Sequence, residues 1–381
     1  MISYRKLAMR VLGHSPVSAV KTARRSTGKR AAALALTAAL VVGMTLPAFA
    51  DTWYIEDGDI SISAGENGNN VTQEGGRTKE NDTDTVITNR ESTASSNTVT
   101  INADEGKTVN VTLDNVTINV DEGSKYAYDP NAYKTAVSVT GSGNTNIELN
   151  GNNTLTSGYG HAGLEHNKTD DSGTLTIQDE KNDDGSAKGS ASDTTGSLTA
   201  TGGGHGAGIG GSNEKDGQVT ITGGEITAKA TGNYGAGIGG GSGGDGTVTI
   251  SGGTITEASG GYMAAGIGSG YQGLGTVTIE GDAVIKNAQG GEAGAGIGSG
   301  TDGDSEIIIR GDAVIENAES SANGAGIGSG QGDLYPDGDG MVIDLTVGNV
   351  TIEGNAKIEN AKSGSGGSGM SILDCNFICI F

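Results

Sequence analysis

Residues 235–268 read GAGIGGGSGGDGTVTISGGTITEASGGYMAAGIG, and this stretch opens and closes on nearly the same glycine-rich pentapeptide. The pentapeptide, Gly/Ala-Ala-Gly-Ile-Gly, occurs five times in the chain, starting at Gly206, Gly235, Ala264, Gly294 and Gly324. The gaps between the copies are 29, 29, 30 and 30 residues. A fixed period of this size is typical of solenoid proteins, in which stacked repeats bury one continuous core.

Four aliphatic columns emerge when the repeats are aligned on the pentapeptide. They are Ile209, Ile238, Ile267, Ile297 and Ile327; Val219, Val248, Val277, Ile307 and Val350; Ile221, Ile250, Ile279, Ile309 and Ile352; and Ile226, Ile255, Ile285, Ile315 and Ile358. The last copy fits only if residues 335–345 are an insertion. The extra residue of the longer repeats is expected in a turn, where Gly281-Asp282-Ala283 replaces a Gly-Gly pair.

The spacing within a repeat decides between helix and strand. In Val219-Thr220-Ile221 the apolar residues are two apart, so a β-strand turns both of them inward and the threonine outward. This period and the 70 glycines exclude a helix. The sequence therefore predicts an all-β parallel β-helix of 29–30 residues per coil, with about three short strands in each coil and coils ~4.8 Å apart.

The remaining segments differ in composition. Residues 1–50 carry eight Lys/Arg and no acid, followed by an apolar run that ends in Ala48-Phe49-Ala50, so they predict a secretory signal peptide. Residues 51–130 alternate like short strands with one buried face and are expected to form N-terminal or capping coils. Residues 131–362 form the solenoid, with regular repeats from about residue 200 and a polar loop inserted at 179–195.

Residues 363–381 combine a Gly/Ser linker with an apolar tail that holds both cysteines, Cys375 and Cys379. The tail lacks a Leu-Pro-x-Thr-Gly sorting motif, and we expect a truncated or frameshifted copy of a longer protein. A short hydrophobic anchor is the alternative, but a membrane-spanning helix needs ~20 residues. No transmembrane segment is expected in the mature chain.

The charge of the chain restricts its partners. The whole sequence has 23 Lys/Arg and 46 Asp/Glu, a net charge of −23, and the first fifty residues hold eight of the basic residues. Nucleic acid and anionic lipid are therefore poor partners. The acids are explained either by solubility or by a cation site.

Aromatic residues fall near one phase of the repeat, just before the pentapeptides: Tyr159, His205, Tyr234 and Tyr262. Stacked coils bring such residues into a row of planar rings, against which the apolar faces of sugars can pack. The alternative is an outward aromatic ladder that only stiffens the stack. Asn287, Asn317 and Asn360 also recur in phase and predict an inward asparagine ladder.

Calcium is a second hypothesis. Asp216, Asp245 and Asp304 stand ten residues after the start of their pentapeptides, in glycine-rich turns where carboxylate and carbonyl oxygens can bind Ca²⁺. Leu274 interrupts the row. The chain also lacks the Gly-Gly-x-Gly-x-Asp array of calcium-binding β-rolls.

Catalysis has little support in the sequence. His161, His166 and His205 have no recognisable nucleophile motif nearby and are expected to be structural or surface residues. Asp282 and Asp312 occupy equivalent turn positions, where paired carboxylates would serve a glycoside hydrolase or lyase and a solvated ladder is the simpler interpretation. We therefore expect a non-enzymatic protein.

Several segments resemble a known family. Thr52-Trp53-Tyr54-Ile55, residues 112–116, residues 149–155 and the repeated Gly-Ala-Gly-Ile-Gly are similar to large secreted surface proteins of Gram-positive gut bacteria, described as carbohydrate-binding-domain proteins. The resemblance covers nearly the whole mature chain. It implies a right-handed β-helix on the cell surface that binds polysaccharide, with calcium as a candidate cofactor.

The sequence thus favours a secreted or cell-surface protein that binds polysaccharide, or host or bacterial surface glycans, or acts as an adhesin. A structural stalk or spacer of a larger surface protein is the main alternative. A β-helical polysaccharide lyase or hydrolase is a further one.

Overall fold

The computed structural model of the protein describes residues 51–120, 133–179, 196–332, 334–337, 340–343, 346–364 and 372–373. The chain divides into two compact units, of which the first, Met1–Phe49, lies outside these residues. The signal peptide, the 180–195 part of the inserted loop and the two cysteines also lie outside the described residues. The second unit, Ala50–Phe381, contains all the described strands.

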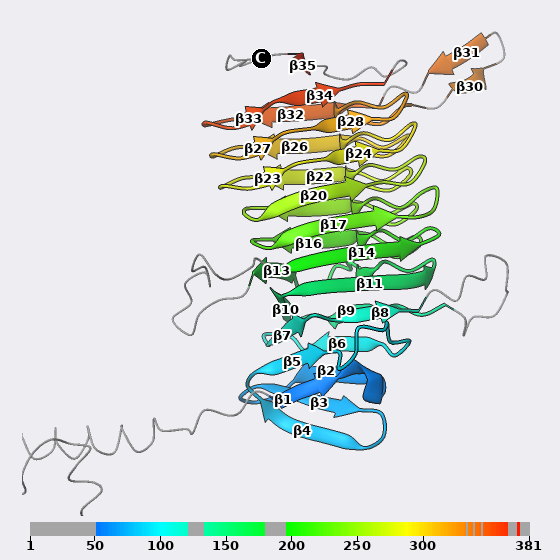
Figure 1. The fold of residues 1–381 in the computed structure, drawn as a ribbon. Helices are drawn as coiled ribbons and strands as arrows, with labels where there is room; N and C mark the ends of the chain where they lie inside the picture. Colours follow the sequence, from blue (N-terminus) through cyan, green and yellow to red (C-terminus); the bar gives the residue numbers. More distant parts are fainter. Residues whose placement is uncertain are drawn as a thin grey trace, which may run out of the picture. The chain divides into compact units, whose positions relative to one another are not determined.

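Each regular coil contains three short strands joined by turns. One coil consists of β16 (Gly217–Ile221), β17 (Glu225–Ala230) and β18 (Ile238–Gly239), and β19 (Gly246–Ile250) begins the next. β16 pairs with β19 in parallel, Val219 opposite Val248 and Ile221 opposite Ile250. The same parallel pairing continues from coil to coil (Figure 1), which confirms the predicted parallel β-helix.

The strands of successive coils form three long sheets. In spatial order, the first sheet contains β1 (Asp51–Tyr54), β5 (Thr85–Thr88), β7 (Thr108–Asp114), β10 (Asn144–Asn150), β13 (Leu175–Asp179), β16, β19, β22 (Gly275–Ile279), β26 (Ser305–Ile309) and β32 (Gly348–Ile352). The second contains β8 (Thr117–Asn119), β11 (Asn152–Tyr159), β14 (Ser197–Gly203), β17, β20 (Thr254–Ser259), β23 (Val284–Ile285) with β24 (Ala288–Gly290), β27 (Val314–Ile315) with β28 (Ala318–Ser320), β33 (Lys357–Ile358) with β34 (Asn360–Lys362), and β35 (Ile372–Leu373). The third contains β4 (Arg77–Asp82), β3 (Asn69–Gln73), β2 (Ile60–Ala64), β6 (Val99–Ala103), β9 (Val137–Gly141), β12 (Leu164–His166), β15 (Ile209–Gly210), β18, β21 (Ile267–Gly268), β25 (Ile297–Gly298) and β29 (Ile327–Gly328).

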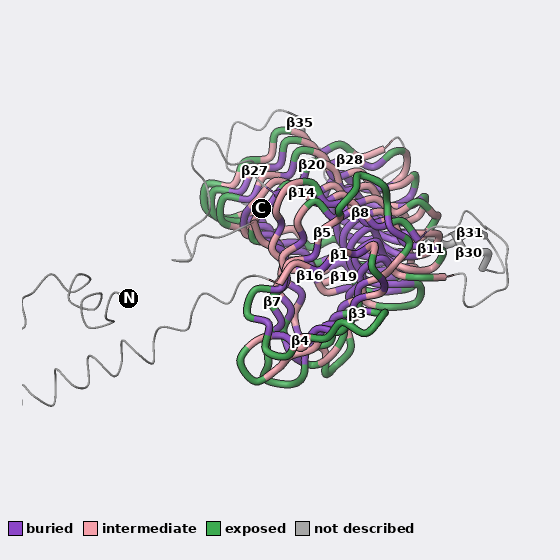
Figure 2. Tube along the Cα trace, turned by 60° about the horizontal axis from the view of Figure 1, so that its bottom comes forward, coloured by how far each residue is buried: buried purple, intermediate pink, exposed green. Residues whose placement is uncertain are grey.

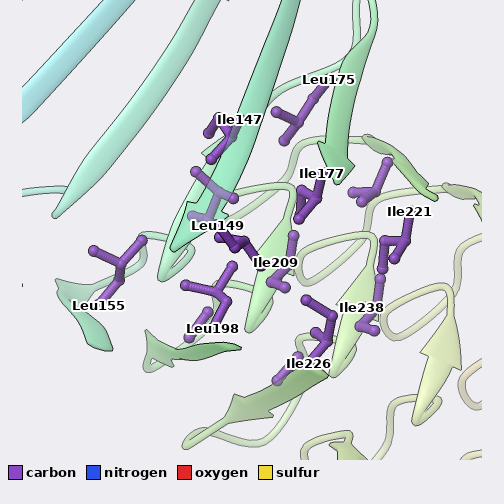
Figure 3. Packing of buried hydrophobic residues seen from close by; sticks show 14 of the residues in the cluster. Ile147, Leu149, Leu155, Leu175, Ile177, Leu198, Ile209, Ile221, Ile226 and Ile238 are labelled. Atoms are coloured by element: carbon purple, nitrogen blue, oxygen red, sulfur yellow. The ribbon is translucent and has the colours of Figure 1, made fainter. Parts of the chain in front are cut away.

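The aliphatic columns form the core between the three sheets. Ile209 pairs with Ile238, and Ile238 with Ile267, and all three side chains are fully buried. Figure 3 shows isoleucines and leucines of different sheets converging on this interior, and Figure 2 shows buried residues inside the coils and exposed ones along the outer turns. All four predicted columns are confirmed by the strand registers. The last members of three of these columns, Val350, Ile352 and Ile358, are only half-buried, whereas Ile327 in the first column is buried.

The predicted insertion in the last coil is confirmed. Ile307 pairs with Val350, although 43 residues separate them, because a hairpin lies in between. This hairpin consists of β30 (Leu334–Asp337) and β31 (Gly340–Ile343), which pair in antiparallel orientation.

The extra residue of the longer repeats lies where the sequence predicts it. Val248 is seven residues before its core neighbour Ile255, whereas Val277 is eight residues before Ile285. The sequence did not predict a second adjustment, a bulge at Thr256, where the register of β17 against β20 shifts by one residue. Side chains therefore remain in their columns although repeat length varies.

The asparagine ladder is present. The Asn317 amide donates to Asn287 Oδ1 at 2.8 Å, and Asn360 donates in turn to Asn317. The three side chains are half-buried rather than fully inside, because Asn287 and Asn317 stand between the two short strands of their coils and Asn360 begins β34.

Coils begin well before the regular repeats, since β1 already pairs in parallel with β5 and β2 with β6. A short 3-10 helix, η1 (Ile55–Asp57), connects β1 to β2. At this end β2, β3 and β4 pair in antiparallel orientation and extend the third sheet. The buried Trp53 donates from Nε1 to Asp82 at 3.1 Å, which joins the first coil to β4. The edge strand β4 carries several charged side chains, which disfavour further edge pairing.

Candidate functional site

Five rings on neighbouring coils form a continuous row, here called the ring stripe: Tyr133, Tyr159, His205, Tyr234 and Tyr271. Their centroids are 5.6, 5.3, 5.1 and 5.5 Å apart in that order. The contact between His205 and Tyr234 is nearly parallel, with 22° between the planes, and the other three are inclined by 45° to 74°. Inclined neighbours leave part of each ring face uncovered.

The backbone of the solenoid explains why these rings meet. The strands place His205 and Tyr234 at equivalent positions of adjacent coils, just before β15 and β18. The turn after the following strand of this sheet, β18 for His205 and β21 for Tyr234, then curls back beside the coil that carries the ring. Tyr271 N donates to Tyr234 O at 3.0 Å, which brings the Tyr271 ring onto Tyr234.

The sequence prediction of this row is partly right. The structure brings Tyr159, His205 and Tyr234 together, and it adds Tyr133 and Tyr271, which the sequence did not indicate. Tyr262 was expected to continue the row but makes none of these ring contacts. The residue is 47% exposed, and a hydrogen bond from its hydroxyl group to Glu292 raises its pKa. Tyr262 precedes the phase of Tyr234 by one residue, which is enough to place it in the neighbouring column.

His205 is the only residue of the ring stripe that is not a tyrosine, and it is half-buried. Its Nδ1 is buried and has no hydrogen-bond partner within the described residues. Desolvation lowers the pKa of His205, and the nearby Glu214 carboxylate opposes this shift. The ring is therefore neutral at pH 7 and packs between Tyr159 and Tyr234 as a flat, largely apolar group.

Polar residues flank the ring stripe. Ser242 N donates to His205 O, Asn213 N donates to Gly160 O, and Met263 N donates to Asn233 O. These backbone contacts hold the two asparagines in the turns next to the rings, and both are exposed. Ring faces bordered by amide and hydroxyl groups match the two surfaces of a sugar, one apolar and one rich in hydroxyl groups.

The three aspartates proposed for calcium have other contacts. Asp216 Oδ1 accepts from Asp245 N at 2.8 Å, and Asp245 Oδ1 accepts from Leu274 N at 2.7 Å. Asp304 does the same for Val347 N in the last coil. Each carboxylate thus binds the backbone amide of the next coil. Within the described ranges, no group of three or more His, Cys, Asp or Glu side chains is arranged to hold a metal, and the calcium site stays a prediction.

The paired aspartates of the turns, Asp282 and Asp312, are both exposed. Asp312 accepts a hydrogen bond from Asn355 Nδ2 at 3.0 Å. This contact joins the turns of neighbouring coils, in agreement with the solvated ladder that is the simpler interpretation of the sequence. That the chain is not an enzyme stays a prediction.

The other two histidines differ from one another. His166 is buried, and its Nδ1 donates to Gln218 O at 2.7 Å. Burial lowers the pKa of His166, and this hydrogen bond partly opposes the shift. His161 is half-exposed and contacts the buried Glu165 through Nδ1 at 2.8 Å. The sequence alone did not point to this pair.

Among the residues that the structure describes, no helix is long and apolar enough to cross a membrane. A beta helix repeat family model matches residues 219–242 and 248–271. No curated protein and no solved structure matches the chain. The matched residues contain all of β17, β18, β20 and β21 and the last three residues of β16 and of β19, so sequence comparison and structure agree that this chain contains β-helix repeats.

Proposed function

We propose that this chain is a non-enzymatic protein that binds polysaccharide along the ring stripe. The observation that carries the proposal is the row of four ring contacts, 5.1 to 5.6 Å long, which joins five rings on the outside of the coils. The basic and apolar composition of residues 1–50 supports export, so we place this activity outside the cell or at its surface.

The dimensions of the solenoid suit an extended ligand. Coils repeat every ~4.8 Å, a distance comparable to the length of one sugar residue in an extended glycan. Rings on neighbouring coils can therefore contact neighbouring sugar residues of one chain. Tyrosine is well suited to this contact because it presents a large apolar face and a polar hydroxyl at little entropic cost.

A stiffening ladder is the rival explanation, and the parallel stacking of His205 on Tyr234 favours it at that one contact. A protein with such a ladder would serve as a stalk or spacer. Aromatic contacts of this kind add about 0.5–1.5 kcal/mol each to stability. Removal of a ring should therefore lower glycan affinity if the row binds glycan, and should lower only stability if the row is a stiffening ladder.

The test is binding to a panel of insoluble polysaccharides and to a glycan array, with wild type, Tyr159→Ala, Tyr234→Ala and Tyr262→Ala. Tyr262→Ala is the matched control, because Tyr262 is an exposed tyrosine of the same coils outside the ring contacts. We expect Tyr234→Ala to weaken binding more than Tyr262→Ala does, with the fold retained by circular dichroism.

Binding that all three variants retain would refute the ring stripe as the site. The absence of binding by the wild type, together with lower stability of Tyr234→Ala, would favour the stalk. Breakdown of a polysaccharide by the pure protein, lost when carboxylates are substituted, would establish the enzymatic alternative.

A further inference from the structure

The coil just before the five regular copies departs from the glycine rule that those copies obey. In the short strands β15, β18, β21, β25 and β29, isoleucine is followed by a glycine whose φ lies between 127° and 140°. In β12 the equivalent residue is Glu165, which pairs with Gly210. Its side chain is only 8% exposed. A buried carboxylate in place of a glycine is unfavourable unless it is hydrogen-bonded, so the departure calls for an explanation.

The Glu165 carboxylate is held by several donors. Its Oε2 accepts from Thr135 Oγ1 at 3.3 Å and from Ala162 N at 3.4 Å, and its Oε1 accepts from Asn167 Nδ2 at 3.0 Å. The shortest contact, 2.8 Å, joins Oε2 to Nδ1 of His161. Both carboxylate oxygens thus have partners inside the protein.

This network orients the His161 ring and selects its tautomer. A carboxylate can only accept, so Nδ1 carries a proton, and in the tautomer with a single ring proton Nε2 is an acceptor. Thr135 Oγ1 lies 2.8 Å from the same Nδ1. Because this hydroxyl donates its proton to Glu165, its oxygen accepts from Nδ1 and helps to hold the ring in place. Within the described part of the chain no hydrogen bond engages Nε2, and the His161 side chain is 31% exposed. The network therefore presents one oriented acceptor toward solvent.

The acceptor lies at one end of the ring stripe. Tyr159 precedes His161 by two residues, Tyr133 precedes Thr135 by two, and the two tyrosine rings are 5.6 Å apart. The backbone supports this position, because Gly203 N donates to His161 O while Gly203 itself pairs with Tyr159.

We infer that Nε2 of His161 accepts a hydrogen bond from a hydroxyl group of the bound glycan, and that Glu165 and Thr135 are positioning residues for this subsite. The inference rests on the proposed function. It also names the class of ligand. A hydroxyl-rich glycan supplies the donor, and the net charge of −23 favours a neutral chain over an anionic one such as a polymer of uronic acids.

The experiment uses an array of neutral gluco-, manno-, xylo- and N-acetylglucosamine oligosaccharides together with oligogalacturonates. The strongest neutral binder is then titrated calorimetrically into wild type, His161→Ala and Glu165→Gln. We expect neutral glycans to bind, and His161→Ala to weaken binding about tenfold, equivalent to about 1.4 kcal/mol. Glu165→Gln removes the charge and allows the amide to donate to Nδ1, so Nε2 becomes a donor and binding weakens as well.

A second readout separates positioning from structure. In ¹⁵N-histidine spectra, the neutral glycan should shift the Nε2 resonance of His161 in wild type, and Glu165→Gln should move the proton from Nδ1 to Nε2 without ligand. His166→Gln is the matched control. The His166 ring is buried and bonded to the backbone, so its substitution should lower stability and leave glycan affinity unchanged.

Unchanged affinity of His161→Ala, with binding lost in Tyr234→Ala, would overturn this inference and leave the proposed function standing. Preference for oligogalacturonates would also overturn it. If the wild type binds no glycan of the array, both the inference and the proposed function fail.

Discussion

Two glycines that lie against one carbonyl group, and a third in open space, allow the close stacking of coils to be tested. Gly239 and Gly246 lie on either side of Gly268 O, and a Cβ atom built on either residue would stand 1.8 Å from that oxygen. Gly239 has a φ of 131°, whereas Gly246 has an ordinary φ. Gly243 has a φ of 72° and nothing within 4 Å of its Cβ position. Alanine at these sites therefore tests the clash and the backbone strain separately.

The expected losses can be worked out from this geometry. At Gly246 the contact forces Gly268 O to move by more than 1 Å, which breaks its 3.0 Å hydrogen bond from Gly240 N. Both groups are buried, and leaving them unpaired costs about 2–4 kcal/mol. At Gly243 only the left-handed conformation is penalised, by about 1–2 kcal/mol. Gly239→Ala combines both effects and should be the most destabilising. A gain of about 0.4–1 kcal/mol from the stiffer unfolded chain applies to all three.

Equilibrium unfolding in urea is the assay, followed by far-UV circular dichroism and by the fluorescence of Trp53. Two probes are needed because a stack of repeats can unfold in more than one step. Trp53 is the only tryptophan and reports on the first coil, whereas circular dichroism reports on all strands. If Gly246→Ala lowers the midpoint no more than Gly243→Ala, Gly268 O does not lie against Gly246, and the stacking described above is wrong.

Ile250→Ala should lower the free energy of unfolding by about 2–5 kcal/mol, because the side chain is fully buried. Ile352→Ala, at a half-buried position of the same column, should lower it by clearly less. Equal losses in urea titrations would contradict this difference in burial. Stability should decrease as the pH falls below 6.5, because burial lowers the pKa of His166 in the folded state and the unfolded chain then binds a proton that the folded chain does not. The decrease should continue until the pH falls through the folded-state pKa and should be flatter in His166→Gln; an unchanged slope in thermal melts across this range would rule out His166 as its source. Removal of calcium with EDTA should leave the unfolding midpoint unchanged, because Asp216 and Asp245 bind backbone amides, and a clear drop in the midpoint would instead support the calcium hypothesis.

The sequence predicts the core well because repetition turns a weak local signal into a strong one. A single Val-Thr-Ile triplet does not distinguish a strand in this fold from other strands, but five aligned copies fix which side chains face inward. The bulge at Thr256 escaped detection, since one added residue in a strand and one fewer in the following turn leave the repeat length unchanged. The registers of paired strands were needed to detect it.

The ring stripe was only half predictable. His205 and Tyr234 share one phase of the repeat, so alignment alone brings them together. Tyr271 comes from a different phase, in the turn that folds back beside the next coil, and no periodicity indicates that contact. One feature of the sequence marks the position of the His161 and Glu165 pair: the chain has Gly163-Leu164-Glu165 where every regular copy has Gly-Ile-Gly.

The identical registers of β16, β19 and β22 have a consequence for the gene. Gly217–Ile221 pairs with Gly246–Ile250 just as Gly246–Ile250 pairs with Gly275–Ile279, so the three segments are interchangeable units. Unequal recombination between their coding sequences would delete or duplicate a whole unit in frame and leave every remaining neighbour a matching partner. Natural variants that differ by one such unit would be shorter or longer by ~4.8 Å, while His161, Glu165 and the first tyrosines would be inherited unaltered.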